Sequence, residues 1–557
     1  MKYTTTQQIV NIIFEGFEKY FEGFRQITRS VEGDFKQENY QKIQGVASQR
    51  QGLYNQTLQS VLDQILNIRP TLENNQSDWA YLKQEYSVTV QNHSAGDIAE
   101  TFFNSIYGRL YNYRHLNNEY LFVSKSYYKH RVTKGGVSAI YHTYQINDNH
   151  LFETIHQLLL DFNFDYENLD RDVGLITATL QQRVSPRFLK SHTITIEVLK
   201  SVFYRNKRGY IIGKLQVQGI LMPFVLPILS VERKVIIETL ITNPNSLSIV
   251  FSFAHSCFLA DTPAPSLLIE FLQVLLPSKL TAELYSSIGF DNHCKTVLIR
   301  QLNAHIKKAP DEMVLWQNQT STSMTTFTLP SFNMVFRVLH DQTSTSDKEA
   351  AIKDKYRTLS QKNRVGRMTQ ALEFYNFIFP KEIMSTQVLE HLCTQAPSQV
   401  KITGNNQISI AYLLVERRMV SLDLFLKKAN VMARKLVMQD YGLAIKQLAL
   451  ANILPANLSL NCFGVSQHSR VICYNYEQLG WLSDVQPEGI HRLTQQIQAI
   501  LKNDPELKEV LTEKHPGLLD KEYWKQLQSR VKSGEIADVP PYEKGLPIDN
   551  KTDMYSF

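Results

Sequence analysis

The residues best placed to do chemistry lie late in the chain, where an expected helix gives way to a short hairpin. The helix stops before Pro455, because proline cannot continue a helix. Asn457 follows, and Cys462 stands five residues further on. After two short expected strands come Asn475 and Glu477. A proton-accepting Asp and a magnesium-binding Asn at this spacing, followed by a hairpin and a second magnesium-binding Asp, form the catalytic frame of protein kinases.

The spacing of that frame is present, but the residue types differ. The carboxamide of Asn457 cannot accept the proton of a substrate hydroxyl, and such general-base catalysis is typically worth about 10²–10⁴ in rate. Magnesium prefers oxygen ligands. Cys462 offers a soft sulfur, Asn475 offers a neutral oxygen, and Glu477 alone offers a carboxylate. These residues therefore predict a missing base and a degenerate magnesium site.

The groups that should hold nucleotide phosphates are also altered. Arg337, in the expected strand MVFRVL, takes the position of the kinase lysine; it keeps the charge but is larger and differently hydrated. No glycine occurs between Gly289 and Gly366. The expected phosphate loop is QNQTST, with Asn318 and Ser321, and its side chains would obstruct close backbone approach to phosphates.

The elements that must position these residues follow from apolar periodicity. In the first half, three- and four-residue steps predict helices around residues 9–24, 58–65 and 102–110. Between about 193 and 250, β-branched segments such as TITIEVL and KVIIETLI predict strands. Helical periodicity returns near Leu267.

The second half opens near Lys307. Two strands are expected, MTTFTLP and MVFRVL, joined by a turn at 330–333, and then a polar segment and a helix that reaches about Phe377. A strand (ISIAYLLVERRMV), a helix at 433–450 and the hairpin LSLNCFGV/RVICYNY complete the order. This is the element order of a kinase core, although on spacing alone a chance succession of helix, proline and hairpin explains it equally well.

Composition limits the other possibilities. The 557 residues predict two domains, and a net charge of +6 is mild for such a length, so a nucleic-acid partner is not expected. Five widely spaced cysteines without a CxxC pair predict reduced thiols and no zinc site. No stretch approaches the ~20 apolar residues of a membrane span, and the first residues do not read as a signal peptide. A cytoplasmic protein without a membrane segment is therefore expected.

Longer stretches carry a resemblance that spans nearly the whole chain in order. They are FFNSIYGRLYNYR (102–114), FYRNK (203–207), IGKL (212–215), TAELYSSIGFDNHCKT (281–296), FTLPSFNMVFRV (327–338), NRVGRM (363–368), VERRMV (415–420), YGLAIKQLALANILP (441–455), FGV (463–465) and DKEYWKQLQSRVKSGEIADV (520–539). Together they resemble the isocitrate dehydrogenase kinase/phosphatase family.

The resemblance implies a bifunctional enzyme that phosphorylates isocitrate dehydrogenase and removes that phosphate at one nucleotide site, which controls the glyoxylate bypass. ATP and magnesium serve the reaction and AMP is an allosteric effector. Carried over by position, the family lysine falls on Arg337 and the catalytic aspartate on Asn457; two further aspartates become Asn363 and Gln370, of which Gln370 best matches the one linked to phosphatase activity. The hinge that meets adenine falls near Glu416 and Met419.

The resemblance implies an α+β fold: a mainly α-helical regulatory domain (1–306) before a protein-kinase-like bilobal domain with a helical tail (307–557). Because the departures concentrate at functional positions, we expect a pseudokinase/pseudophosphatase that binds protein or nucleotide. The candidate partners are isocitrate dehydrogenase, an active homologue, or a second copy in a homodimer. The alternative is an active kinase/phosphatase.

Two further expectations concern the same region. Most of the family's proline-rich insertion after the hairpin is missing beyond Trp481, which brings recognition of isocitrate dehydrogenase into question. A changed chemistry with Cys462 as nucleophile is a third possibility, against which an inert buried thiol is favoured.

Overall fold

The structure is a computed structural model. It describes residues 3–74, 77–113, 118–124, 140–146, 150–183, 194–251, 258–308, 311–316, 323–343, 346–362, 365–404, 406–455, 458–466, 469–474, 476, 479–502 and 504–535. Among these residues, no helix is long and apolar enough to cross a membrane.

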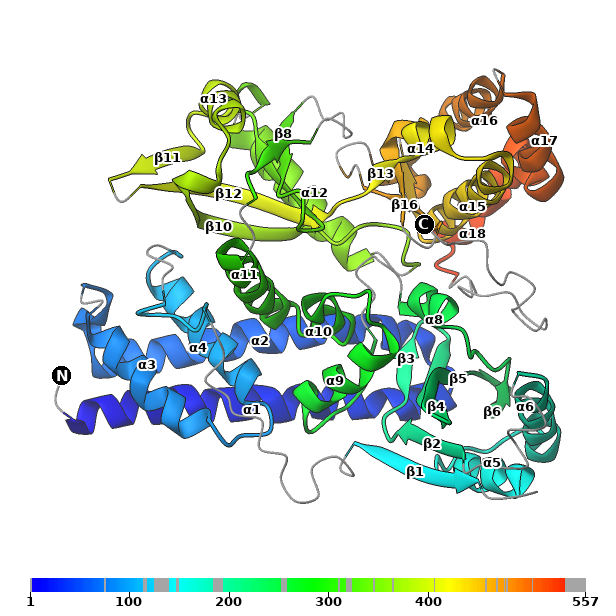
Figure 1. Ribbon diagram of the computed structural model, residues 1–557, viewed down its shortest axis with the longest axis horizontal. Coiled ribbons are helices and arrows are strands. Elements are labelled where there is room, and N and C mark those ends of the chain that lie inside the picture. The colour runs from blue at the N-terminus through cyan, green and yellow to red at the C-terminus, as the bar shows by residue number, and fades with distance from the viewer. Residues whose placement is uncertain are drawn as a thin grey trace.

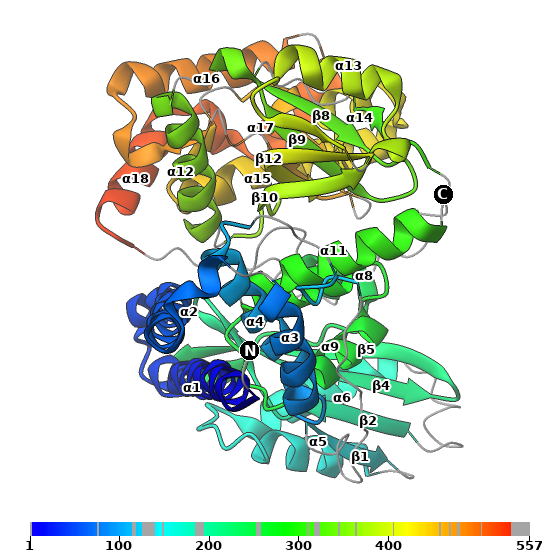
Figure 2. The ribbon, with the colours of Figure 1, turned by 90° about the vertical axis from the view of Figure 1, so that its left-hand side faces the viewer.

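Long helices form the first part of the chain. They are α1 (Tyr3–Lys36), α2 (Tyr40–Ile68), α3 (Ser77–Val90) and α4 (Gly96–Leu110). α1 and α2 pack side by side along much of their length (Figures 1 and 2). The apolar stripe of α1 is the cause: Ile9, Ile13 and Phe17 recur at four-residue steps and are fully buried. The helices expected around 9–24, 58–65 and 102–110 are confirmed.

A six-stranded antiparallel sheet follows, as the β-branched segments predicted. Its strands are β1 (Tyr141–Ile146), β2 (Ile194–Leu199), β4 (Arg208–Val217), β5 (Ile220–Val231) and β6 (Lys234–Ile237) in that order, with β3 (Phe203–Arg205) paired to β4. Gln218 and Gly219 join β4 to β5, and their φ values of 50° and 80° suit a two-residue hairpin turn. Two helices, α5 (Leu151–Leu160) and α6 (Leu169–Arg183), lie against this sheet (Figure 1).

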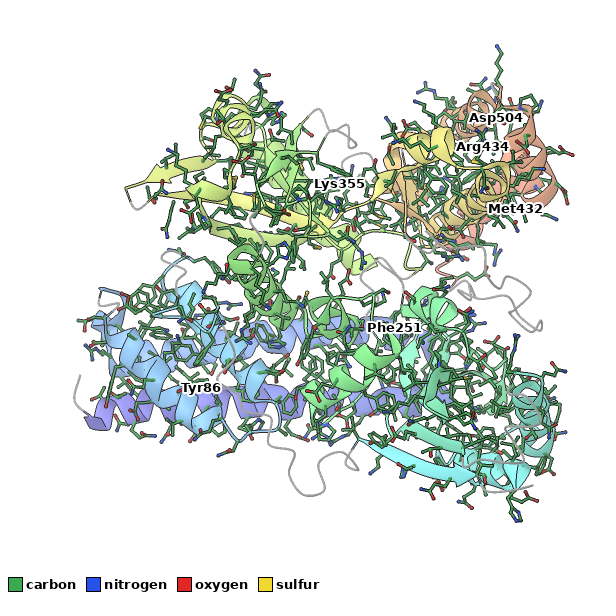
Figure 3. All side chains as sticks on the ribbon, in the orientation of Figure 1. Tyr86, Phe251, Lys355, Met432, Arg434 and Asp504 are labelled. Atoms are coloured by element: carbon green, nitrogen blue, oxygen red, sulfur yellow. The ribbon has the colours of Figure 1, made fainter. Side chains whose placement is uncertain are left out.

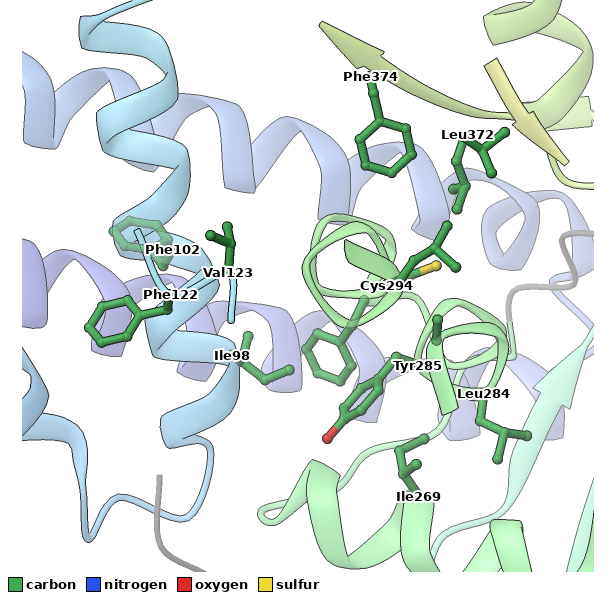
Figure 4. Packing of buried hydrophobic residues seen from close by; sticks show 14 of the residues in the cluster. Ile98, Phe102, Phe122, Val123, Ile269, Leu284, Tyr285, Cys294, Leu372 and Phe374 are labelled. Atoms are coloured by element: carbon green, nitrogen blue, oxygen red, sulfur yellow. The ribbon is translucent and has the colours of Figure 1, made fainter. Parts of the chain in front are cut away.

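Four helices connect this sheet to the second part of the chain. They are α8 (Pro244–Phe251), α9 (Pro265–Leu275), α10 (Thr281–Ser287) and α11 (Asp291–Lys308). Figure 2 shows α11 between the two parts. One hydrophobic cluster runs through this junction: Tyr285 and Cys294 of α10 and α11 belong to the same cluster as Leu372 and Phe374 beyond them (Figure 4).

The second part begins with another antiparallel sheet. Its order is β10 (Leu372–Pro380), β12 (Gln407–Arg417), β9 (Met334–Leu339), β8 (Met324–Thr328) and β7 (Val314–Leu315), with β11 (Val400–Thr403) also on β12. The accompanying helices are α12 (Ser346–Lys362) and α13 (Thr386–Gln395). We call this sheet and these helices the first lobe. The expected pair of strands on either side of 330–333 is confirmed as β8 and β9.

The second lobe is mostly helical. Its helices are α14 (Leu422–Lys428), α15 (Val431–Leu450), α16 (Pro487–Leu501), α17 (Pro505–Lys514) and α18 (Lys521–Lys532). Its short strands are β13 (Val420–Ser421), β14 (Ile453–Pro455), β15 (Phe463–Val465), β16 (Val471–Cys473) and β17 (Leu479–Trp481). Arg434 of α15 forms an ion pair with Asp504, which caps α17, and Figure 3 labels both residues. The helix expected at 433–450 and the hairpin around Gly464 are confirmed.

One expected element is wrong. The helix that should reach Phe377 ends at Lys362, and residues 372–380 form the strand β10. The aromatic-rich sequence LEFYNFIFP places Phe374, Phe377 and Phe379 in the core, and β10 pairs with β12 over its length. Pairing and burial of aromatic side chains on a sheet outweigh the apparent helical continuity. The elements α13 and β11 were not predicted from the sequence either.

Candidate active site

Five buried side chains meet where the first lobe joins the second. We call them the junction cluster: Arg337, Thr369, Glu416, Met419 and Tyr474. None exposes more than 3% of its surface. They come from β9, from the segment before β10, from β12 and the turn after it, and from the end of β16. Segments far apart in the chain therefore converge on Arg337 of β9.

Arg337 and Glu416 form the charged centre of the cluster. Arg337 of β9 stands opposite Leu414 of β12, so Glu416, two residues further, lies on the same face of the sheet. Nη2 of Arg337 is 3.7 Å from Oε2 of Glu416. Both side chains are buried, so each charge compensates the other away from water.

Thr369 ties Glu416 to the second lobe. Its Oγ1 donates a hydrogen bond of 3.2 Å to Oε2 of Glu416. The backbone carbonyl of Thr369 accepts a hydrogen bond from the hydroxyl of Tyr476. Burial, followed by the nearby carboxylate of Glu416, raises the pKa of Tyr476 well above its ordinary value, so this phenol stays protonated and acts as a donor.

Tyr474 also contacts Arg337. The guanidinium carbon lies 5.8 Å from the centre of the Tyr474 ring, within the range of a cation–π contact. The hydroxyl of Tyr474 donates to the carbonyl of Asn461 at 2.6 Å, which fixes the ring. Burial raises the pKa of Tyr474. An uncharged aromatic ring therefore fills the space beside the cation.

Met419 closes the cluster at the link between the lobes. A Cβ on Gly464 would come within 2.8 Å of the Met419 Cβ and 3.1 Å of the Tyr474 ring. The glycine allows β15 to approach these side chains closely. The expected hinge residues Glu416 and Met419 are both buried, and Met419 lies close to Gly464.

Cys462 lies beside the cluster and not in it. Its Sγ is 3.4 Å from Oγ of Ser459 and 3.7 Å from Oδ1 of Asn461. Burial raises the pKa of the thiol above its ordinary value. A protonated thiol is a poor nucleophile and a poor ligand for magnesium. Within the described part of the chain, no group of three or more His, Cys, Asp or Glu side chains could hold a metal ion.

Gln370 points away from the junction cluster. Its Nε2 donates to Oγ of Ser286 at 2.6 Å, and that hydroxyl donates to Oδ1 of Asp291 at 2.6 Å. Gln370 therefore contacts α10 of the first part, and Ser286 links that contact to Asp291 of α11. The remaining expected site residues lie outside the described residues: Asn318, Ser321, Asn363, Asn457, Asn475 and Glu477.

Sequence reasoning missed Thr369 and Tyr474. It also missed the buried Asp440, which binds Arg367 and Arg470 and so ties the segment before Thr369 to β16. Tyr474 directly precedes Asn475 in the chain, which is the one signal that could have directed attention to it. No local pattern links Asp440 to an arginine 73 residues earlier.

The strand order, the helix inserted after β9 and the hairpin at β15–β16 define a protein-kinase-like bilobal domain behind a mainly helical regulatory domain. Two family models match the chain: "Isocitrate dehydrogenase kinase/phosphatase (AceK), regulatory domain" over residues 10–310, and the kinase domain of the same family over 311–498 and 485–544. The chain belongs to the isocitrate dehydrogenase kinase/phosphatase family.

Named relatives align along almost their whole length. A protein of Idiomarina loihiensis named isocitrate dehydrogenase kinase/phosphatase is 30% identical, covering 97% of this chain and 98% of its own. One of the same name from Pectobacterium carotovorum is 31% identical, covering 98% and 96%. A third, from Pseudoalteromonas translucida, is named isocitrate dehydrogenase kinase/phosphatase 2; it is 30% identical and covers 96% and 98%.

Proposed function

We propose that this chain is a non-catalytic member of its family, a pseudokinase/pseudophosphatase that acts by binding. The observation that carries the proposal is the junction cluster. Arg337, at the position of the kinase lysine, contacts both Glu416 and the Tyr474 ring. Only 2% of Arg337 is exposed, so little of its guanidinium is open to a nucleotide phosphate.

The described residues do not fit ATP and magnesium as they stand. The cluster is filled by side chains of the protein itself, and Cys462 offers a buried, protonated sulfur where magnesium would need oxygen. The substitutions at Asn457 and Asn475 add the loss of a base and of a charged ligand. Loss of base and ligands together removes most of the rate of phosphoryl transfer, although such losses are not additive.

The role that then fits is binding to isocitrate dehydrogenase, to an active homologue or to a second copy of this chain. The four described cysteines, Cys294, Cys393, Cys462 and Cys473, are free thiols, which suits a cytoplasmic setting. ATP, magnesium and AMP are the ligands to test first. The full-length match to named kinase/phosphatases favours the alternative, an active bifunctional enzyme.

A nucleotide titration tests the proposal. The protein is heated with and without ATP and magnesium, next to the Idiomarina relative as positive control. We expect a rise in Tm for the relative and none for this chain. A magnesium-dependent rise here, or transfer of labelled phosphate to isocitrate dehydrogenase, would overturn the proposal.

A restored variant separates lost residues from a lost fold. It carries Arg337→Lys, Asn457→Asp, Cys462→Asn and Asn475→Asp, which return the family residue types at these positions. We expect this variant to gain a magnesium-dependent rise in Tm with ATP. A wild type that binds ATP as well as the restored variant does would contradict the assignment of these positions.

A further inference from the structure

Neighbouring residues of β12 serve different parts of the molecule. Successive side chains of a strand point to opposite faces. Glu416 faces the junction cluster, and Arg417 faces the regulatory domain. Nη1 of Arg417 donates to both carboxylate oxygens of Glu283, at 2.7 and 2.8 Å, and Nη2 donates to the carbonyl of Ser278 at 3.3 Å. A single peptide unit thus joins the buried ion pair to a contact with α10.

The segment before β10 repeats this arrangement. Thr369 hydrogen-bonds Glu416, while the next residue, Gln370, donates to Ser286. Glu283 and Ser286 both belong to α10. Two chain segments that hold the same carboxylate therefore reach, one residue later, the same helix of the regulatory domain.

The helix α10 is itself fixed in the regulatory domain. The N–H of Leu280 donates to Oε2 of Glu283 at 2.9 Å. Tyr285 donates to the buried carboxylate of Asp97 on α4, and His293 of α11 lies 3.4 Å from the same carboxylate. Figure 4 shows Tyr285 and Leu284 packed in the cluster that continues to Leu372. Movement of α10 would therefore disturb its contacts both in the regulatory core and with the first lobe.

The contact between Arg417 and Glu283 is strong. Both side chains are largely buried, and the carboxylate receives two hydrogen bonds from one guanidinium. Burial alone would raise the pKa of Glu283, but Arg417 and Lys279 outweigh burial and lower the pKa below its ordinary value. The carboxylate is therefore charged at neutral pH and holds Arg417 in place.

We propose that α10 is the regulatory element that keeps the junction cluster closed, with Arg417 and Gln370 as the positioning residues that transmit its position to Glu416 and Thr369. A displacement of α10 moves Arg417, which follows Glu416, and Gln370, which follows Thr369. The contact between Arg337 and Glu416 then opens. This goes beyond the proposed function, because it concerns how the cluster is held and not whether it binds nucleotide.

Hydrogen exchange on the full chain without nucleotide tests the idea. Glu283→Gln weakens the contact with Arg417, and Gln370→Ala removes the second contact with α10. Amide exchange is followed in the peptides that cover residues 334–339 and 471–474. None of the contacts of α10 described above is to these residues. We expect amides there to exchange about tenfold faster in Glu283→Gln, since a charge-assisted contact is lost, and measurably faster in Gln370→Ala.

Two matched variants serve as controls. Glu238→Gln weakens another buried ion pair, with Arg208, within the regulatory sheet. Asn376→Gly removes another amide hydrogen bond between the two parts of the chain, from Asn376 to the carbonyl of Asn112. In the junction cluster described above, Asn376 makes no contact with Glu416. If the two peptides exchange no faster in Glu283→Gln and Gln370→Ala than in these controls, the proposal is wrong. If Glu283→Gln does not fold, Gln370→Ala alone decides.

Discussion

Asp440 holds Arg367 by two parallel hydrogen bonds, from Nη1 to Oδ2 at 2.6 Å and from Nη2 to Oδ1 at 2.9 Å. The same carboxylate accepts from Nη1 of Arg470 and from the N–H of Val471, each at 2.7 Å. Burial would raise the pKa of Asp440, but Arg367 and Arg470 outweigh it and lower the pKa to about 2. The segment that leads to Thr369 is thereby fixed to the hairpin of the second lobe.

Replacing this carboxylate should be costly. Asp440→Asn leaves two buried guanidinium groups without their carboxylate, and we expect a loss of about 3–5 kcal/mol in the free energy of unfolding. The lowered pKa means that the contribution of Asp440 is complete above the unfolded pKa of about 4 and is lost as the pH falls toward 2. Urea unfolding at several pH values should show that the difference in the free energy of unfolding between wild type and variant becomes smaller from pH 7 to pH 3. The control is Asp63→Asn, at an exposed position. If the difference in the free energy of unfolding between wild type and Asp440→Asn does not change with pH, the lowered pKa of Asp440 is contradicted.

Lys279 predicts a pH dependence of the same sign in a different, alkaline window. Burial lowers the pKa of this lysine to about 8, although Glu283 favours its charge. The unfolded chain then binds more protons than the folded protein between pH 8 and about 10.5, so stability from this group rises with pH across that window. We expect wild type to gain up to about 3 kcal/mol relative to Lys279→Met between pH 7.5 and 10, measured by urea unfolding. If the free energies of unfolding of the two proteins change with pH in parallel, the lowered pKa of Lys279 is contradicted.

Gly464 and Gly52 should respond in opposite directions to the same substitution. Gly464→Ala places a Cβ 2.8 Å from the Met419 Cβ, so neighbouring side chains must shift, at about 1–3 kcal/mol. Gly52 lies within α2 and has no atom within 4 Å of an added Cβ. Gly52→Ala should stabilise by about 0.5–1 kcal/mol, because alanine favours a helix over glycine. Thermal unfolding of both variants checks this, and equal shifts would contradict the close packing at Met419.

Continuity of the first hydrophobic cluster predicts how the molecule unfolds. The cluster contains Phe17 of α1 and Phe102 of α4 together with Phe336 of β9 and Phe374 of β10. The regulatory helices and the first-lobe sheet therefore share buried surface, and we expect them to unfold together. Calorimetry should give one transition for these parts. A separate early transition of the first lobe, with the regulatory helices intact, would refute the expectation.

Sequence patterns predicted those parts of the fold whose signals are local. The stripe of α1, the turn between β8 and β9 and the helix before Pro455 each follow from a few adjacent residues. The helix expected to reach Phe377 failed because the pairing of β10 with β12 decides its structure, and that partner lies some 35 residues away.

The candidate site divides in the same way. The strand position of Arg337 could be predicted from its neighbours. Its contacts with Glu416 and Tyr474 could not, because they join segments that only the folded chain brings together. The α10 contacts of Arg417 and Gln370 likewise could not be predicted, although Arg417 lies within one of the stretches that carry the family resemblance and Gln370 lies two residues after another.

The shared core between Tyr285 and Leu372 also bears on how such a gene can change. A substitution at a position outside this cluster leaves the shared core in place. Deleting the whole second half is another matter, because it would strip apolar residues that cover α10 and α11. Single substitutions in the second half are therefore far easier to accommodate than its deletion, because the regulatory helices depend on it for part of their buried surface.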